Sequence, residues 1–126
     1  MKTKKILSNY FIGLDQFLHQ KLPSNNLYKP ISYTFNLGGK RIRPFFLLYS
    51  YKIFGGNGKQ INQVALALES LHNFSLIHDD VMDNAEKRRG KLSVQKKWNS
   101  NTAILSGDAL LIICFQLLNS ISFKNK

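Results

Sequence analysis

Three aspartates and two arginines lie close together in one short segment of the sequence. Asp79, Asp80 and Asp83 form a DDxxD pattern, and Arg88 and Arg89 follow it. Carboxylates one helical turn apart repel each other unless a cation lies between them, and oxygen ligands suit Mg²⁺. Guanidinium groups fit phosphate oxygens bidentately. The segment therefore indicates a site for a metal-bound diphosphate, although the DDxxD pattern alone is equally compatible with a solvated helix end.

A second group of cations lies in the motif GGKRIRP, residues 38–44. The two glycines are typical of a helix end and Pro44 of a helix start, so Lys40, Arg41 and Arg43 fall beside a helix N-terminus. The free N–H groups and the helix dipole favour an anion there. All four arginines of the chain occur in these two motifs, against fourteen lysines along its length. A second anion site is indicated.

Helical patterns position both groups. Apolar residues from Val64 to Leu71 recur at three- and four-residue intervals, and neither Pro nor Gly occurs between residues 59 and 87. We therefore predict a central helix over residues 60–84, with Asp79, Asp83 and His72 close to one face. The chain shows no strand pattern, so the predicted fold class is all-α. The other predicted helices span residues 4–21, 27–37, 44–54, 93–98 and 102–121, and residues 88–92 form a turn.

Four motifs resemble, in order and spacing, those of the trans-isoprenyl diphosphate synthases, also called polyprenyl synthetases. They are GGKRIRP (38–44), ESLHNFSLIHDDVMD (69–83), RRGK (88–91) and NTAILSGDALL (101–111). The resemblance implies an isoprenoid-synthase-type helical bundle. It also implies a prenyltransferase of isoprenoid biosynthesis, which condenses isopentenyl diphosphate with an allylic diphosphate to make a longer trans-polyprenyl diphosphate.

The resemblance also implies roles for individual residues. The residues that would bind isopentenyl diphosphate are Lys40, Arg43, His72 and Arg89. Asp79 and Asp83 would bind Mg²⁺ that bridges to the allylic diphosphate, and Asp80 would support them. Arg88 would contact the same allylic diphosphate. The metal and the arginine would stabilise the departing pyrophosphate, which is the charge stabilisation that breaking the carbon–oxygen bond requires.

Phe74 and Ser75 precede the first aspartate and, by the resemblance, would set the length of the product. A short-to-medium product such as geranylgeranyl diphosphate is expected. An ideal helix places Ser75 within about 40° of Asp79 and Phe74 about 140° away. Helix geometry alone therefore does not place Phe74 beneath the growing chain.

Composition limits the remaining possibilities. A chain of 126 residues with 44% apolar content forms one domain. The single cysteine, Cys114, excludes an internal disulfide and suits a reducing compartment, so a cytoplasmic location is expected. The net charge of +11 raises the question of nucleic acid, but the lysines are scattered and diphosphates account for the arginines. No nucleic-acid partner is predicted.

The last predicted helix is apolar on every side, so we expect it to be buried on every side. Its uninterrupted apolar run, Ala109–Phe115, is far shorter than the ~20 residues of a membrane span, so no transmembrane segment is predicted. The family's second aspartate-rich motif has no counterpart in the sequence. We therefore expect residues 1–126 to be a polyprenyl synthetase domain truncated before that motif.

Two readings of function follow. In one, the chain is a synthase that works as a homodimer or by pairing with another synthase chain. In the other, it is a non-catalytic subunit or an inactive remnant. Terpene cyclases and squalene-type synthases also place aspartate motifs on helices. By the resemblance, Lys40, Arg43 and Arg89 would form a dedicated isopentenyl site, which argues against both.

Overall fold

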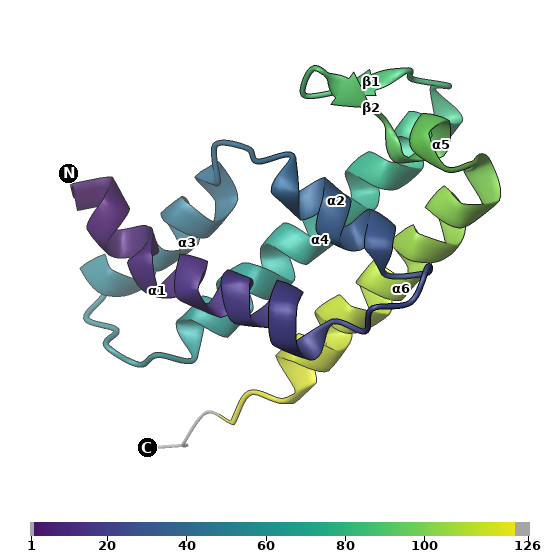
Figure 1. Cartoon of the computed structure of the whole chain (residues 1–126). Coiled ribbons are helices and arrows are strands. Elements are labelled where there is room, and N and C mark those ends of the chain that lie inside the picture. Colours follow the sequence, from purple (N-terminus) through teal and green to yellow (C-terminus); the bar gives the residue numbers. More distant parts are fainter. Residues whose placement is uncertain (1, 123–126) are drawn as a thin grey trace.

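The computed structural model describes residues 2–122 and consists almost entirely of helices (Figure 1). The all-α prediction is confirmed. The elements in chain order are α1 (Lys2–Gln16), the π-helical turn η1 (Phe17–Lys21), α2 (Lys29–Asn36), α3 (Ile42–Ile53), α4 (Ile61–Met82), β1 (Lys87–Arg88), β2 (Lys91–Leu92), α5 (Val94–Lys97) and α6 (Ser100–Asn119).

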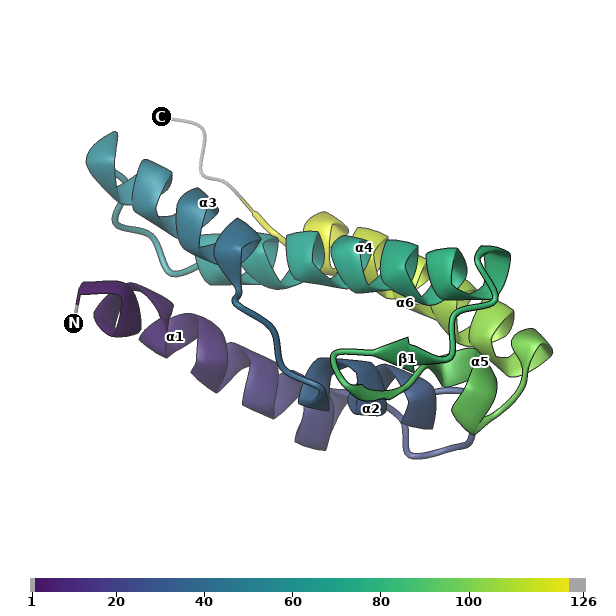
Figure 2. The ribbon, with the colours of Figure 1, turned by 90° about the horizontal axis from the view of Figure 1, so that it is seen from above.

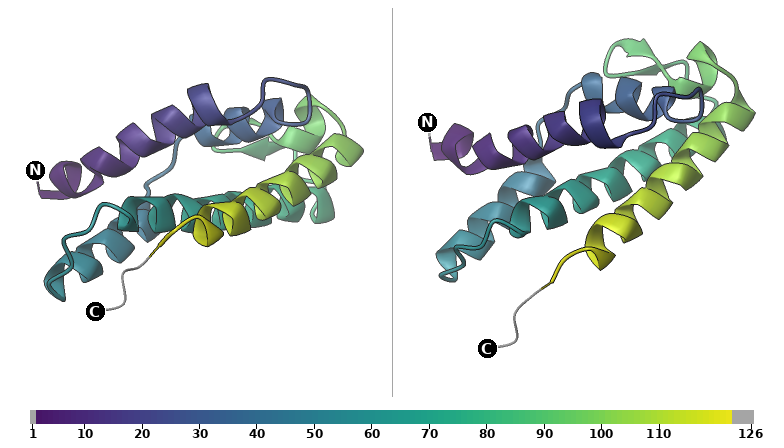
Figure 3. Two further views of the ribbon diagram at one scale, coloured as in Figure 1. Left: turned by 90° about the horizontal axis from the view of Figure 1, so that it is seen from below. Right: turned by 60° about the horizontal axis from the view of Figure 1, so that its bottom comes forward.

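The helices form two layers. Figures 2 and 3 show α1 and α2 on one side, and α3, α4 and α6 on the other. The long helices α4 and α6 run antiparallel and contact each other, and α1 packs across α3 and α4. The short β1–β2 hairpin and α5 connect α4 to α6 at one end of the molecule (Figure 1).

The core lies between these layers. The first predicted helix supplies four of its buried side chains, Leu7, Tyr10, Leu14 and Phe17, which recur at three- and four-residue intervals and so lie on one face. They meet buried residues of α2, α4 and α6, and the rings of Phe17 and Phe35 lie edge to face at 6.0 Å. The predicted helix is regular only to Gln16, because residues 17–21 take a wider π-helical turn.

The end of α4 differs slightly from the prediction. The helix ends at Met82, and Asn84 adopts a left-handed conformation with φ of 49°. The Asn84 N–H donates to the Val81 carbonyl (3.2 Å) and the Ala85 N–H to the Asp80 carbonyl (2.9 Å). This is a Schellman cap, in which the left-handed position is most often glycine and next most often asparagine. Asp83 therefore caps the helix instead of lying within it.

Helix α6 is not buried on every side, so that expectation is wrong for the described residues. One face packs on α4, where Ala103, Leu110 and Cys114 are buried. The apolar side chains on its open face are exposed by 40–59%, namely Ile104, Leu105, Ile112, Phe115 and Leu118. Within residues 2–122, the elements packed on α6 leave this face uncovered.

The same helix is the one described element long and apolar enough to cross a membrane. It has 20 residues, its most apolar 18-residue stretch has a mean hydropathy of 1.6, and 28% of that stretch is buried. A single helix of this kind is weak grounds for a span, because core helices of globular proteins share these properties.

Candidate diphosphate-binding site

A β-hairpin with a two-residue loop sets the directions of the Arg88 and Arg89 side chains. Lys87 pairs with Leu92 and Arg88 with Lys91, which leaves Arg89 and Gly90 as the loop. Both loop residues have positive φ, 52° and 77°, as a type I′ turn requires. The sequence had predicted this segment as a turn without strands, and the paired residues correct that detail. The geometry turns the two neighbouring arginines toward different partners.

Arg88 is bound to the second aspartate of the DDxxD motif. Its Nε donates to Asp80 Oδ2 at 3.1 Å and its Nη2 to Oδ1 at 2.6 Å, a bidentate pair. The Asp80 side chain is buried, whereas Arg88 is partly exposed. The hydrogen bond to Asp80 raises the pKa of Arg88, burial opposes the shift, and the charges of the aspartates add to it. Asp80 therefore holds Arg88 at the C-terminal end of α4.

Asp79 and Asp83 lie differently from Asp80. Both are exposed, and the Asp83 N–H donates to the Asp79 carbonyl at 2.8 Å, so the two residues are one turn apart. Within residues 2–122, no group of three or more His, Cys, Asp or Glu side chains is arranged to hold a metal ion. The motif thus divides into one buried carboxylate with a protein partner and two that face solvent.

The loop between α2 and α3 carries the second group of cations. Gly38 and Gly39 have φ of 82° and 136°, and Arg41 is left-handed at 52°, so the chain turns sharply before α3. The Arg41 side chain points inward: Nη1 donates to Glu69 Oε1 at 2.9 Å and Nη2 to the Phe35 carbonyl at 3.0 Å. Both members of this ion pair are buried. Arg41 therefore anchors the loop to α4.

The other cations of the loop face a small cavity. The cavity has a volume of about 60 Å³ and is lined by Lys40, Arg41, Ile42, Arg43, Glu69, His72 and Arg89. Arg43 Nη1 lies 3.3 Å from His72 Nε2, which can accept this hydrogen bond when the imidazole is neutral. Burial, then the neighbouring Arg43, lowers the pKa of His72, with a smaller opposing effect of Glu69. The neutral form is therefore favoured near pH 7.

Arg89 joins the hairpin to this loop. Its Nη1 donates to the Gly38 carbonyl, and a Cβ at Gly39 would lie 3.0 Å from Arg89 Nη2. Burial and the nearby Arg41 lower the pKa of Arg89, but the guanidinium stays protonated. Glu69 neutralises Arg41, so Lys40, Arg43 and Arg89 leave the cavity positively charged. The structure thus brings together Lys40, Arg43, His72 and Arg89, the four residues expected at one diphosphate.

Phe74 and Ser75 lie between the cation cavity and the aspartates, and both are half-buried. The Phe74 ring contacts His78 edge to face at 4.6 Å, and the Ser75 hydroxyl donates to the His72 carbonyl at 2.6 Å. His78 in turn lies over α6, with Nε2 3.0 Å from the Ile104 carbonyl. The structure does not place a prenyl chain, so the role of these two residues stays a prediction.

Gly107 makes the close packing of His78 on α6 possible. A Cβ at Gly107 would lie 2.4 Å from His78 Nε2, so no side chain fits there without movement. His78 therefore has packing partners on α6.

Sequence reasoning missed Glu69 as part of the site and treated Arg41 as one more phosphate-facing cation. A signal was present, because Glu69 is the one acidic residue between Asp15 and Asp79 and lies on an otherwise apolar and neutral stretch of helix. A buried carboxylate in such a position needs a cation. Which of the nearby arginines would pair with it depends on the loop conformation.

Together, the long antiparallel helices, the cation cavity and the exposed aspartate pair define an isoprenoid-synthase-type fold with two candidate anion sites. The family model for polyprenyl synthetase matches residues 24–126. The chain belongs to the polyprenyl synthetase family. The resemblance stated from the motifs is confirmed.

Individual relatives agree with this assignment. The chain is 40% identical over 123 residues to farnesyl diphosphate synthase of Micrococcus luteus, covering 94% of this chain and 42% of the relative. It is 40% identical over 120 residues to geranylgeranyl diphosphate synthase of Methanosarcina mazei, covering 95% and 37%. The crystal structure of a geranylgeranyl pyrophosphate synthase superimposes with a TM-score of 0.87 and 41% identity, covering 95% of this chain and 36% of that one.

The chain therefore spans about two fifths of the length of these relatives. The matched part carries the first aspartate motif and the cation cavity.

Proposed function

We propose that this chain provides the diphosphate-binding half of a prenyltransferase that condenses isopentenyl diphosphate with an allylic diphosphate. The observation that carries the proposal is the arrangement along α4. His72 lies at the cation cavity and Asp79 is seven residues further on, a rise of about 10 Å. Arg88 and Arg89, adjacent in the hairpin, connect these two regions. Two diphosphates can therefore be held side by side along one helix.

Lys40, Arg43, His72 and Arg89 would hold isopentenyl diphosphate. They surround the cavity of about 60 Å³, and His72 in its neutral form can accept from Arg43 while offering Nδ1–H to a phosphate oxygen. Three uncompensated cations suit a diphosphate group. These residues position the substrate whose double bond attacks.

Asp79, Asp83 and Arg88 would bind the allylic diphosphate. Two exposed carboxylates one turn apart fit Mg²⁺, which binds through one or two carboxylates together with substrate phosphates and water. When bound, the ion neutralises charge on the leaving group. Asp80 keeps the Arg88 guanidinium beside this pair, where it can contact a phosphate oxygen.

The reaction then proceeds by ionisation, condensation and elimination. The carbon–oxygen bond of the allylic diphosphate breaks and pyrophosphate leaves with the electron pair. The double bond of isopentenyl diphosphate attacks the allylic cation and forms the new carbon–carbon bond. Loss of a proton to the released pyrophosphate restores a double bond. The role of this chain's residues is to preorganise positive charge around the leaving group.

We also infer that the chain works in the cytoplasm and pairs with a second synthase chain. The one buried cysteine, Cys114, whose pKa is raised by burial, suits a reducing compartment. The open apolar face of α6, with Ile112 and Phe115 more than half exposed, supports pairing.

Phe74 and Ser75 remain the proposed determinants of product length, and geranylgeranyl diphosphate is the proposed product.

The test is incorporation of labelled isopentenyl diphosphate into an extractable prenyl product. The purified 126-residue chain is incubated with Mg²⁺ and allylic diphosphates of increasing length, and Asp79→Ala, Asp83→Ala is the control variant. A product that disappears in the variant supports the proposal. Folded protein that binds pyrophosphate but yields no product would assign the chain to the alternative, a non-catalytic subunit or remnant.

A further inference from the structure

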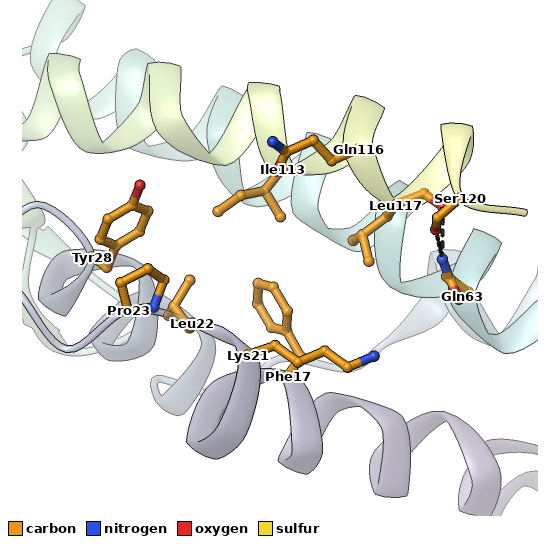
Figure 4. A pocket seen from close by; sticks show the side chains of 10 residues that line it. All are labelled: Phe17, Lys21, Leu22, Pro23, Tyr28, Gln63, Ile113, Gln116, Leu117 and Ser120. Atoms are coloured by element: carbon orange, nitrogen blue, oxygen red, sulfur yellow. Dashed lines mark hydrogen bonds between the residues drawn. The ribbon is translucent and has the colours of Figure 1, made fainter.

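A cavity of about 350 Å³ lies between η1, the loop that follows it and the C-terminal half of α6 (Figure 4). Its walls are mainly apolar, formed by Phe17, Leu22, Tyr28, Ile113 and Leu117. The volume falls in the range of small-molecule pockets. None of its lining residues lines the cavity that holds Lys40 and Arg43.

One end of this cavity is fixed by hydrogen bonds. Gln63 Nε2, in the first turn of α4, donates to the Leu117 carbonyl at 2.8 Å and to the Ser120 hydroxyl. These bonds tie the start of α4 to the end of α6, as Figure 4 shows. The Gln63 amide is thereby bound to protein, and the wall it forms is held in a defined position.

The π-helical turn η1 forms the facing wall. The Leu22 N–H donates to the Phe17 carbonyl at 2.9 Å, which closes the wide turn. The Phe17 ring points into the space between η1 and α6, and the Lys21 side chain runs along its edge (Figure 4). π-Helical turns occur frequently at functional sites because they redirect side chains that a regular helix would place elsewhere.

Charge is placed at one end of the apolar space. Among the described residues that line the cavity, Lys21 carries the one charge. A second cavity of about 170 Å³ adjoins it, shares Phe17, Lys21, Gln63 and Leu117, and adds Lys59. An apolar chamber therefore adjoins a smaller hollow that two lysines, Lys21 and Lys59, help to line.

We propose that these joined cavities bind a single-chain amphiphile with an anionic head. The tail would lie against Phe17, Ile113 and Leu117, and a carboxylate or phosphate head would lie between Lys21 and Lys59. Gln63 and Asp79 are sixteen residues apart on α4, about 24 Å along the helix, so this site is separate from the aspartate pair. The proposal does not depend on prenyl transfer.

Calorimetric titration of the 126-residue chain with dodecanoate and with dodecyl phosphate, both below their micelle concentrations, tests the site. One equivalent of at least one anion is expected to bind, and neutral dodecanol more weakly. Lys21→Gln should weaken anion binding about fivefold, the upper range for an exposed ion pair. Lys52→Gln removes the same charge outside both cavities and should leave binding unchanged.

A bulky substitution that fills the larger cavity provides the second test. Leu117→Trp should abolish binding, whereas Leu118→Trp, on the neighbouring residue outside both cavities, should retain it. If only dodecyl phosphate binds, the site is specific for a phosphate head group. If both anions bind, the site accepts either a carboxylate or a phosphate head group. Binding of neither anion would overturn the proposal. Binding of several equivalents that Lys21→Gln leaves unchanged would also overturn it, because the probes would then coat the open face of α6. Lys21 is exposed, so its variant tests the site without disturbing the core.

Discussion

Arg41 Nη1 and Glu69 Oε1 form a 2.9 Å ion pair whose side chains are only 6% and 4% exposed. The pair joins the loop that carries the proposed isopentenyl site to the middle of α4. The guanidinium also donates to the Phe35 carbonyl, so the end of α2 is held by the same group. One buried arginine therefore links three helices.

Removing one partner of this pair should be far more harmful than removing both. Glu69→Leu is expected to lower the free energy of unfolding by about 3–5 kcal/mol, because Arg41 would be buried without a counter-charge. The double variant Arg41→Met, Glu69→Leu should recover most of that loss. Urea unfolding of the two single variants and the double variant checks this. Additive losses would show that the pair is not coupled.

Gly39→Ala should damage both stability and anion binding. The added Cβ would lie 3.0 Å from Arg89 Nη2 at a φ of 136°, where an alanine is strained by about 1–3 kcal/mol. Gly13→Ala is the matched control, because Gly13 lies in α1 with nothing within 4 Å of a Cβ, and should stabilise by about 0.5–1 kcal/mol. Thermal unfolding and pyrophosphate titration are the measurements. Equal effects of the two substitutions would contradict the role of Gly39.

The DDxxD aspartates should separate into two kinds. Asp80→Asn is expected to cost about 1–3 kcal/mol, because it breaks the bidentate pair of a buried carboxylate with Arg88. Asp79→Asn changes an exposed side chain and should alter stability by less than about 0.5 kcal/mol, yet weaken Mg²⁺-dependent binding of pyrophosphate. Denaturant unfolding and calorimetry distinguish the two effects. A large stability loss in the Asp79→Asn variant would contradict this division, because it would show that the Asp79 carboxylate supports the fold as Asp80 does.

His72 should make stability depend on pH on the acid side of neutrality. Its pKa in the folded chain is lowered, first by burial and then by Arg43, so the unfolded chain binds the proton more readily. Stability from this group is present above its unfolded pKa of about 6.5 and is lost as the pH falls below it. His72→Gln should reduce the dependence of the melting temperature on pH between pH 7 and pH 5. His19→Gln, at an exposed histidine, is the control, and the same reduction there would refute the assignment to His72.

Much of the fold followed from local pattern. The apolar spacing between residues 60 and 84 and the absence of Pro and Gly predicted α4, and the structure places it at residues 61–82. The end was harder to predict, because it depends on the left-handed conformation of Asn84 and two cap bonds. The cations that line the small cavity could also be singled out as candidates, since glycine turns and arginine pairs have local signatures.

The sequence by itself determined the all-α class and the family, and it singled out candidate side chains for diphosphate binding, because helical periodicity and motif spacing act over a few residues. Only the tertiary structure decided which partner each of the three arginine side chains binds. Arg41 turns inward to Glu69, Arg88 binds Asp80, and Arg89 holds the Gly38 carbonyl. These pairs join residues between 8 and 51 positions apart, and their formation depends on loop geometry and burial, which no local pattern encodes.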